Sequence, residues 1–153
     1  GPAQISVGRP DIGGRRGAMA LMGAEELGIP YEDIRCTIAD TATLGYNEIS
    51  HGSRVTYASG LATIKAAKDA VQKLCKRAAE KWGIPEDAVK WEDGCAVPSG
   101  ANAGDFDPLP LHKITANMGA TGGPIVGHFE ATPEGAGVSF ATHIVDAEVD
   151  HET

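Results

Sequence analysis

The spacing of apolar residues predicts two helices. Strong helix formers run from Ala18 to Leu27, and Gly28 with a proline two residues later is a typical helix end. A longer helix is predicted after Ser53, its N-cap, and extends to Trp82, because apolar residues recur there every three or four positions. These positions are Val55, Ala58, Ala62, Ala66, Ala70, Val71, Leu74, Cys75, Ala78 and Trp82. Such an apolar stripe is typical of a helix that lies on a sheet.

Alternating positions predict strands on either side of the first helix, at Gln4–Val7 and Ile34–Ala39. This β-α-β order favours a sheet with a helix across one face. The Asp93-Gly94 pair is typical of a tight hairpin turn. The other predicted elements are the hairpin strands Ala88–Glu92 and Cys95–Pro98, a short helix Leu111–Met118, and a C-terminal β-hairpin of His128–Thr132 and Val138–Val149. The predicted fold is α+β (mixed α/β), one domain over residues 1–153, with the long helix packed on a mixed sheet.

Composition and charge narrow the class of protein. The chain has 153 residues and a net charge of −8, which argues against a nucleic-acid or anionic-membrane partner because such partners require excess Lys and Arg. No apolar run of about 20 residues and no secretory signal is found, so a soluble cytoplasmic protein is expected. The three cysteines and five histidines lack metal-ligand spacing, so no metal site is predicted. No catalytic triad can be selected from the sequence.

Two glycine-rich turns precede predicted helices. The first turn is Gly13-Gly14-Arg15-Arg16-Gly17, and the second turn is His51-Gly52-Ser53-Arg54. Free amides and the positive end of a helix dipole attract anions, and arginine adds charge-assisted hydrogen bonds. Phosphate or pyrophosphate is the ligand that this chemistry suits. Neither turn is a dinucleotide fingerprint or a P-loop, and helix starts with surface arginines are the alternative interpretation.

Four blocks within residues 11–56 carry a family resemblance. They are Asp11–Arg16, Met19–Gly28, Ile34–Thr41 and His51–Thr56, and the similarity continues through Trp82, Trp91–Gly94 and Ala147–Asp150. The chain resembles the large, molybdopterin-binding subunit of the molybdenum hydroxylases, the group of xanthine dehydrogenase, aldehyde oxidase and carbon monoxide dehydrogenase. The resemblance implies part of the second molybdopterin-binding domain.

The resemblance also implies a cofactor site. In the family, a D-x-G-Q-G-type turn and a G-G-S-R-type turn hold the phosphate or dinucleotide end of molybdopterin. The matching residues are Gly13 and Gly14 in the first turn and Gly52, Ser53 and Arg54 in the second. The glutamine between the two glycines is missing, and Arg15 and Arg16 follow instead as candidate cofactor-binding residues. The expected cofactor is molybdopterin with molybdenum, as the mononucleotide or the cytosine dinucleotide.

By resemblance, the parent protein is an oxidoreductase whose partners are the remainder of the large subunit and iron-sulfur and flavin subunits. Gly1-Pro2 is typical of a protease scar, and no strand follows Asp150–Thr153, so we expect an excerpt of a longer protein. No residue matches the family's catalytic glutamate, so the isolated chain is expected to be inert. The alternative, favoured by the missing glutamine, is a non-catalytic α+β module that binds a phosphorylated small molecule or a protein partner.

Overall fold

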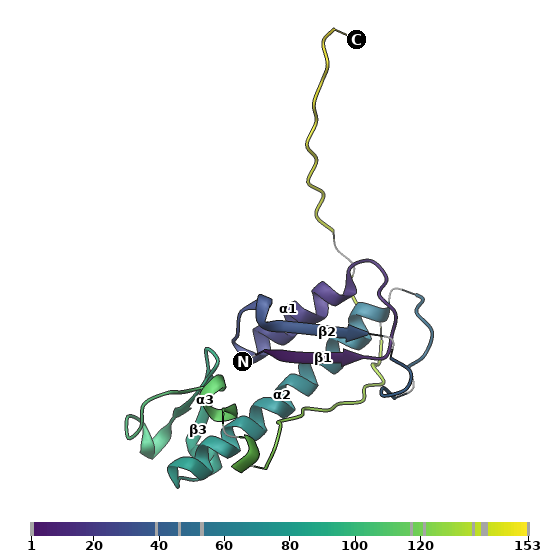
Figure 1. Ribbon diagram of the computed structural model, residues 1–153. Coiled ribbons are helices and arrows are strands. Elements are labelled where there is room, and N and C mark those ends of the chain that lie inside the picture. Colours follow the sequence, from purple (N-terminus) through teal and green to yellow (C-terminus); the bar gives the residue numbers. More distant parts are fainter. Residues whose placement is uncertain are drawn as a thin grey trace.

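The N-terminal part folds as a β-α-β unit. The computed structural model describes residues 2–38, 40–45, 47–52, 54–116, 118–120, 122–135, 137–138 and 141–152. Strands β1 (Ala3–Val7) and β2 (Ile34–Ile38) are parallel, with Ala3 opposite Ile34 and Val7 opposite Ile38. Helix α1 (Arg15–Leu27) connects them and packs its apolar side chains against β2 (Figure 1). The predicted β-α-β start is confirmed.

Helix α2 (Arg54–Trp82) packs against both halves of the molecule. Its first half packs on α1 through Ala67 and Val71, and its second half packs Leu74 and Ala78 on a second sheet. That sheet is antiparallel, in the order β3 (Val89–Glu92), β4 (Cys95–Pro98) and β5 (Leu109–Pro110). The remaining helices are α3 (Leu111–Thr115) and four short 3-10 turns, η1 (Tyr31–Asp33), η2 (Glu86–Ala88), η3 (Gly100–Asn102) and η4 (Met118–Ala120).

The α+β class and the hairpin at Asp93-Gly94 are confirmed, but the predicted mixed sheet is corrected. Two separate sheets form in the described part of the chain, one of β1 and β2 and the other of β3 to β5. The reason is the length of α2. Its 29 residues extend about 43 Å at 1.5 Å per residue, much further than the five-residue strands β1 and β2, so its second half packs on β3 to β5 and not on the first sheet.

Both long helices end in the same way. Gly28 and Gly83 have left-handed φ values of 63° and 70°. The amide of the following residue then bonds back over the last turn, Ile29 to the Ala24 carbonyl at 3.2 Å and Ile84 to the Ala79 carbonyl at 3.1 Å. This is the Schellman arrangement, and each Gly-Ile-Pro leads into a 3-10 turn and a strand. The predicted helix ends are confirmed.

The segment after η4 runs back along α2 (Figure 1). Side chains of α2 bind its carbonyl groups: Arg77 Nη2 donates to Gly123 at 3.1 Å and Lys73 Nζ to Val126 at 2.7 Å. The described residues of 122–152 contain no β-strand, so the hairpin predicted at His128–Thr132 and Val138–Val149 does not form among them. The alternating pattern is present there, but backbone groups of this segment bond to side chains of α2: the His128 amide donates to Asp69 at 3.0 Å, and Tyr57 donates to the Glu134 carbonyl at 3.2 Å.

Candidate functional site

The two glycine-rich turns lie at one end of the molecule. Helices α1 and α2 are parallel, because Thr63 Oγ1 donates to Met19 Sδ at 3.3 Å near their starts and Lys68 pairs with Glu26 at 3.6 Å further along. Both helix N-termini therefore point the same way, toward the edge where β1 and β2 end (Figure 1). Two positive helix ends at one edge form an electrostatic environment that favours an anion.

The segments that lead into the two turns touch each other. Arg9, two residues after β1, donates from Nη1 to the Ile49 carbonyl at 3.5 Å. The backbone at Gly8 lies so close to Asn47 that a Cβ there would be 2.0 Å from its side-chain nitrogen. The sequence does not predict these contacts, and they place the approach to the first turn against the approach to the second.

Glycines keep both turns open. Gly13 and Gly14 have φ values of 68° and 77°, and Gly52 has a φ of 62°, all in the left-handed region that favours glycine. No heavy atom outside their immediate neighbours lies within 4 Å of the position that a Cβ would take at any of the three. Ser53, the second-turn hydroxyl, lies outside the described residues. A ligand could therefore approach the backbone at both turns.

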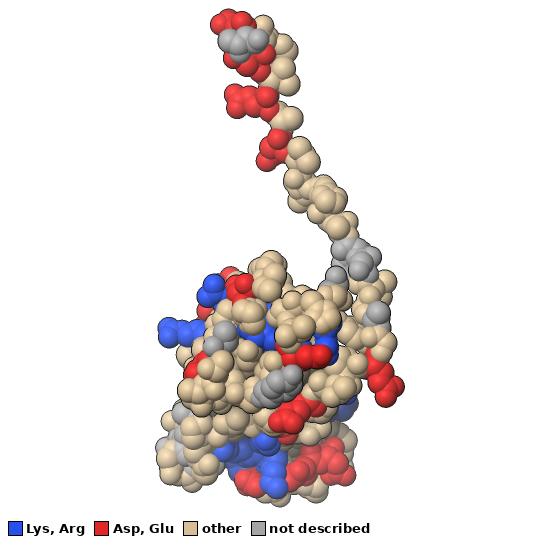
Figure 2. Space-filling view, turned by 90° about the vertical axis from the view of Figure 1, so that its right-hand side faces the viewer, with Lys and Arg blue, Asp and Glu red and all other residues tan. Residues whose placement is uncertain are grey.

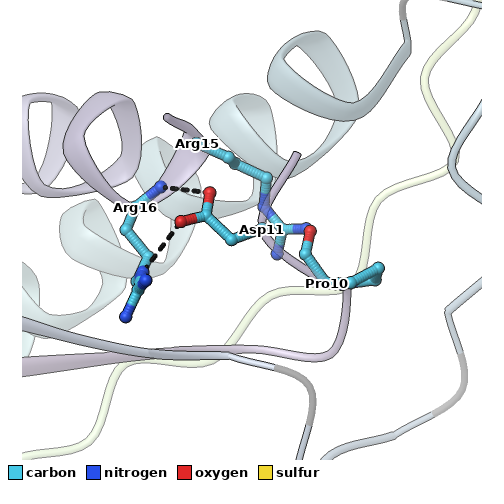
Figure 3. Close-up of polar contacts among 4 residues, drawn as sticks. All are labelled: Pro10, Asp11, Arg15 and Arg16. Atoms are coloured by element: carbon cyan, nitrogen blue, oxygen red, sulfur yellow. Dashed lines mark hydrogen bonds and ion pairs between the residues drawn. The ribbon is translucent and has the colours of Figure 1, made fainter. Parts of the chain in front are cut away.

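The outer arginines already hold carboxylates. The Arg16 amide and Nε donate to Asp11 at 3.3 and 2.8 Å, and this interaction holds the pKa of Asp11 below its ordinary value (Figure 3). Arg54, at the start of α2, pairs in the same way with Glu48. All four side chains keep solvent exposure, so these are displaceable ion pairs. Each predicted anion site thus contains an acidic group of the chain itself.

Arg15 points inward, away from Arg16 (Figure 3). Its side chain is 1% exposed and donates from Nη1 to the Pro10 carbonyl at 2.7 Å. Burial lowers the pKa of the Arg15 guanidinium, and the positive charge of Arg9 also lowers it, whereas Cys36 and Asp11 oppose this shift. Arg9 itself is 5% exposed. Sequence reasoning missed Arg9, for which the one available signal was a basic residue between a strand and a glycine-rich turn.

The Asp11–Arg16 pair predicts a pH effect at the start of α1. Because the pKa of Asp11 is lowered from 3.8 in the folded chain, its stabilisation is complete above pH 3.8. That stabilisation should be lost as the pH falls through the lower, folded value. NMR titration of the Asp11 carboxyl carbon should show a midpoint below 3.8, and Arg16→Met should move it upward. A wild-type midpoint at the ordinary value would contradict the pairing.

Surface charge does not form one basic face around this end. Viewed from the side on which the helices start, Lys and Arg alternate with Asp and Glu (Figure 2). Within the described ranges, no three His, Cys, Asp or Glu side chains gather as a metal site would require. In the same part of the chain, no helix has the length and apolar character needed to cross a membrane. Because charges of both signs are mixed on this face, an anion there would interact with local donors and not with one basic surface.

The chain is similar to a known domain family and to several solved structures. The family model of the molybdopterin cofactor-binding domain matches residues 1–153. A Cu,Mo carbon monoxide dehydrogenase in its carbon monoxide reduced state is 28% identical, with a TM-score of 0.63 over 71% of this chain and 13% of its own. Reconstituted CO dehydrogenase from Oligotropha carboxidovorans is 27% identical, with a TM-score of 0.62 over 70% of this chain and 13% of its own.

A third similar structure shows the fold alone. Quinoline 2-oxidoreductase from Pseudomonas putida 86 is 19% identical, with a TM-score of 0.62 over 79% of this chain. The chain spans only 13% to 15% of the length of these three proteins.

Proposed function

Because this chain belongs to the family of molybdopterin cofactor-binding domains, as a fragment of a molybdenum hydroxylase large subunit, we propose that its two turns hold the phosphate end of the cofactor. The residues are Gly13, Gly14, Arg15, Arg16, Gly52, Ser53 and Arg54. The observation that carries the proposal is the meeting of two parallel helix starts, each with open glycines and an arginine, at one edge. When bound, molybdenum and the pterin would supply the redox chemistry.

The described residues fit an anionic group. The Asp11 and Glu48 carboxylates occupy the positions at Arg16 and Arg54 where phosphate oxygens are expected, so both positions already accept negative charge. The Arg15 Nε and Nη2 atoms are buried without a hydrogen-bond partner among the described residues. Our proposal assigns backbone amides of the turns and the outer guanidinium groups to the ligand, with Asp11 and Glu48 displaced on binding.

The wider role belongs to the same proposal. The parent protein would be a cytoplasmic oxidoreductase of the molybdenum hydroxylase type, with iron-sulfur and flavin subunits as partners. The cytosine dinucleotide is the form of cofactor that two adjacent anion sites suit best, because its pyrophosphate offers charge to both. Without the remainder of the large subunit and its catalytic glutamate, the isolated chain would bind but not turn over.

Binding of pyrophosphate and cytidine diphosphate tests the proposal directly. Both ligands should shift the NMR amide signals of Gly13, Gly14 and Gly52 at millimolar concentration or below. Arg16→Ala and Arg54→Ala should each weaken binding about five- to tenfold, the effect of losing one charge-assisted hydrogen bond. Glu48→Gln should instead tighten binding severalfold, since it removes the internal competitor of Arg54.

Arg35→Ala is the matched control for these variants. Arg35 is an exposed arginine near the start of β2, at the opposite end of the strand from the turns. Its replacement by alanine removes one positive charge, as Arg16→Ala and Arg54→Ala do, but at a distance from both turns. It should leave the affinity within about twofold. The proposal fails if millimolar pyrophosphate shifts none of the three glycine amides, or if Arg35→Ala weakens binding as much as Arg16→Ala.

A further inference from the structure

We propose that Arg9, Arg15 and Ser50, together called the inner cluster, bind one phosphate oxyanion beneath the two turns. This site lies inside the outer pairs formed by Arg16 and Arg54. It deepens the function proposed above and depends on that function for the source of the phosphate, which would be the cofactor tail. The arginines of the inner cluster are buried, and several donor atoms of the cluster have no hydrogen-bond acceptor among the described residues, so an anion would supply what these groups lack.

The three residues come from three places in the sequence, and hydrogen bonds from the two arginines to backbone carbonyl groups link the segments that carry them. Arg15 Nη1 donates to the carbonyl of Pro10, the residue after Arg9. Arg9 Nη1 in turn donates to the carbonyl of Ile49, the residue before Ser50. The inner cluster therefore joins the end of the β1 segment, the first residue of α1 and the approach to α2.

Several donors in the inner cluster have no acceptor in the described part of the chain. Arg15 Nε, Arg15 Nη2 and Ser50 Oγ are buried and form no hydrogen bond there. Arg15 and Arg9 are 1% and 5% exposed, so water reaches their side chains poorly. Proteins seldom bury an unpaired guanidinium, because its desolvation is recovered only through a paired charge and complete hydrogen bonding.

Neither of these two arginines forms an ion pair with a carboxylate of the described chain. The Asp11 carboxylate is bonded to Arg16, on the outer side of the turn. The Cys36 thiol lies near Arg15, but burial raises its pKa, so it stays neutral and offers no counter-charge. Two like charges thus lie close enough to repel each other, and among the described residues neither has a carboxylate in direct contact.

A phosphate oxyanion has the chemistry that this cluster lacks. Its oxygens can accept two parallel N–H bonds from one guanidinium and a further bond from a serine hydroxyl, and its charge offsets both arginines. The backbone at Gly13 and Gly14, the two residues before Arg15, is open to an approaching ligand, since nothing lies within 4 Å of the position of a Cβ at either glycine. The inner cluster would therefore hold the innermost phosphate, and Arg16 and Arg54 the outer charge.

Inorganic phosphate is the probe for this site, and isothermal titration with thermal unfolding is the measurement. Phosphate should bind the wild-type chain and raise its melting temperature. Arg9→Met and Arg15→Met should weaken phosphate binding about tenfold or more, and Ser50→Ala about threefold. Without phosphate, Arg15→Met should melt above the wild type, because it removes a buried unpaired charge. Arg35→Met, at an exposed site, is the control and should change neither quantity.

The outcomes separate this inference from the proposed function. If Arg9→Met, Arg15→Met and Ser50→Ala all bind phosphate as the wild type does, the inner cluster is overturned, whereas amide shifts at Gly13, Gly14 and Gly52 would still support the two turns. If phosphate binding depends on Arg9 and Ser50 but pyrophosphate shifts no turn amide, the cluster stands and the proposed function fails. Should Arg15→Met not fold, Arg9→Met and Ser50→Ala give the same decision.

Discussion

Gly28→Ala should destabilise the chain far more than Gly83→Ala, although both glycines end a helix in the same Gly-Ile-Pro sequence. Both have left-handed φ values, so alanine costs about 1 kcal/mol at either position for backbone strain alone. At Gly28 the new Cβ would also lie 2.3 Å from the Gly94 amide nitrogen and 2.9 Å from the Asp93 carbonyl carbon. At Gly83 nothing lies within 4 Å.

Urea unfolding followed by circular dichroism measures the difference. We expect a loss of about 3–5 kcal/mol for Gly28→Ala, because backbone atoms of the hairpin turn cannot move aside without shifting β3 and β4. For Gly83→Ala we expect about 1 kcal/mol. Equal losses would show that the hairpin yields freely, and would contradict the close packing of Gly28 on Gly94.

The same contact joins the two halves of the fold. Trp91 Nε1 on β3 donates to the Leu27 carbonyl at 3.1 Å, next to Gly28. The end of α1 is therefore bonded to the hairpin of the second sheet as well as packed on α2. Disruption at Gly28 should thus weaken the coupling between the two halves, and the unfolding transition of the variant should broaden or divide.

Met19→Ala should give the other large loss, because Met19 fills the interface between the two parallel helices. Its side chain is fully buried, accepts a hydrogen bond from Thr63 and lies against Gly60. Removing it leaves a cavity, with an expected cost of about 2–5 kcal/mol. Thermal and urea unfolding measure this loss. Pyrophosphate binding should weaken as well, since this interface sets the separation of the two turns.

Leu21→Ala is the matched control on the same helix. Leu21 is 60% exposed, so the same loss of an apolar side chain should cost less than about 1 kcal/mol there. Pyrophosphate affinity should stay unchanged in this variant. If Met19→Ala unfolds at wild-type urea concentrations, or if the two variants are alike, α1 and α2 are not held together by this contact.

Local signals in the sequence predicted local structure well. Gly28 and Gly83 mark helix ends because glycine enters the left-handed conformation at little cost, and Asp93-Gly94 marks a hairpin because its tight turn needs positive φ at both residues, which glycine and, less readily, aspartate can adopt. The alternation at Val138–Val149 was a weaker guide. A strand also requires a partner, and the pattern of one segment does not show whether another segment pairs with it.

The candidate site was predictable only in part. The glycines and outer arginines of both turns could be found from spacing, since a helix start attracts anions whatever surrounds it. The inward direction of Arg15 depends on Pro10, and the role of Arg9 depends on Ile49, which is 40 residues away in sequence. Burial of a charged side chain is a property of the assembled fold, and so it cannot be inferred from neighbouring residues.

If the two turns hold the cofactor as proposed, the acidic partners of Arg16 and Arg54 would make cofactor binding an exchange reaction. For every guanidinium that a phosphate gains, one carboxylate is released to water, so the number of ion pairs at the surface hardly changes. Affinity is then the small difference between two similar attractions. Such a site would discriminate by charge density. A doubly charged phosphate is attracted to a guanidinium more strongly than the carboxylate that it displaces, whereas a singly charged metabolite is attracted only about as strongly as that carboxylate.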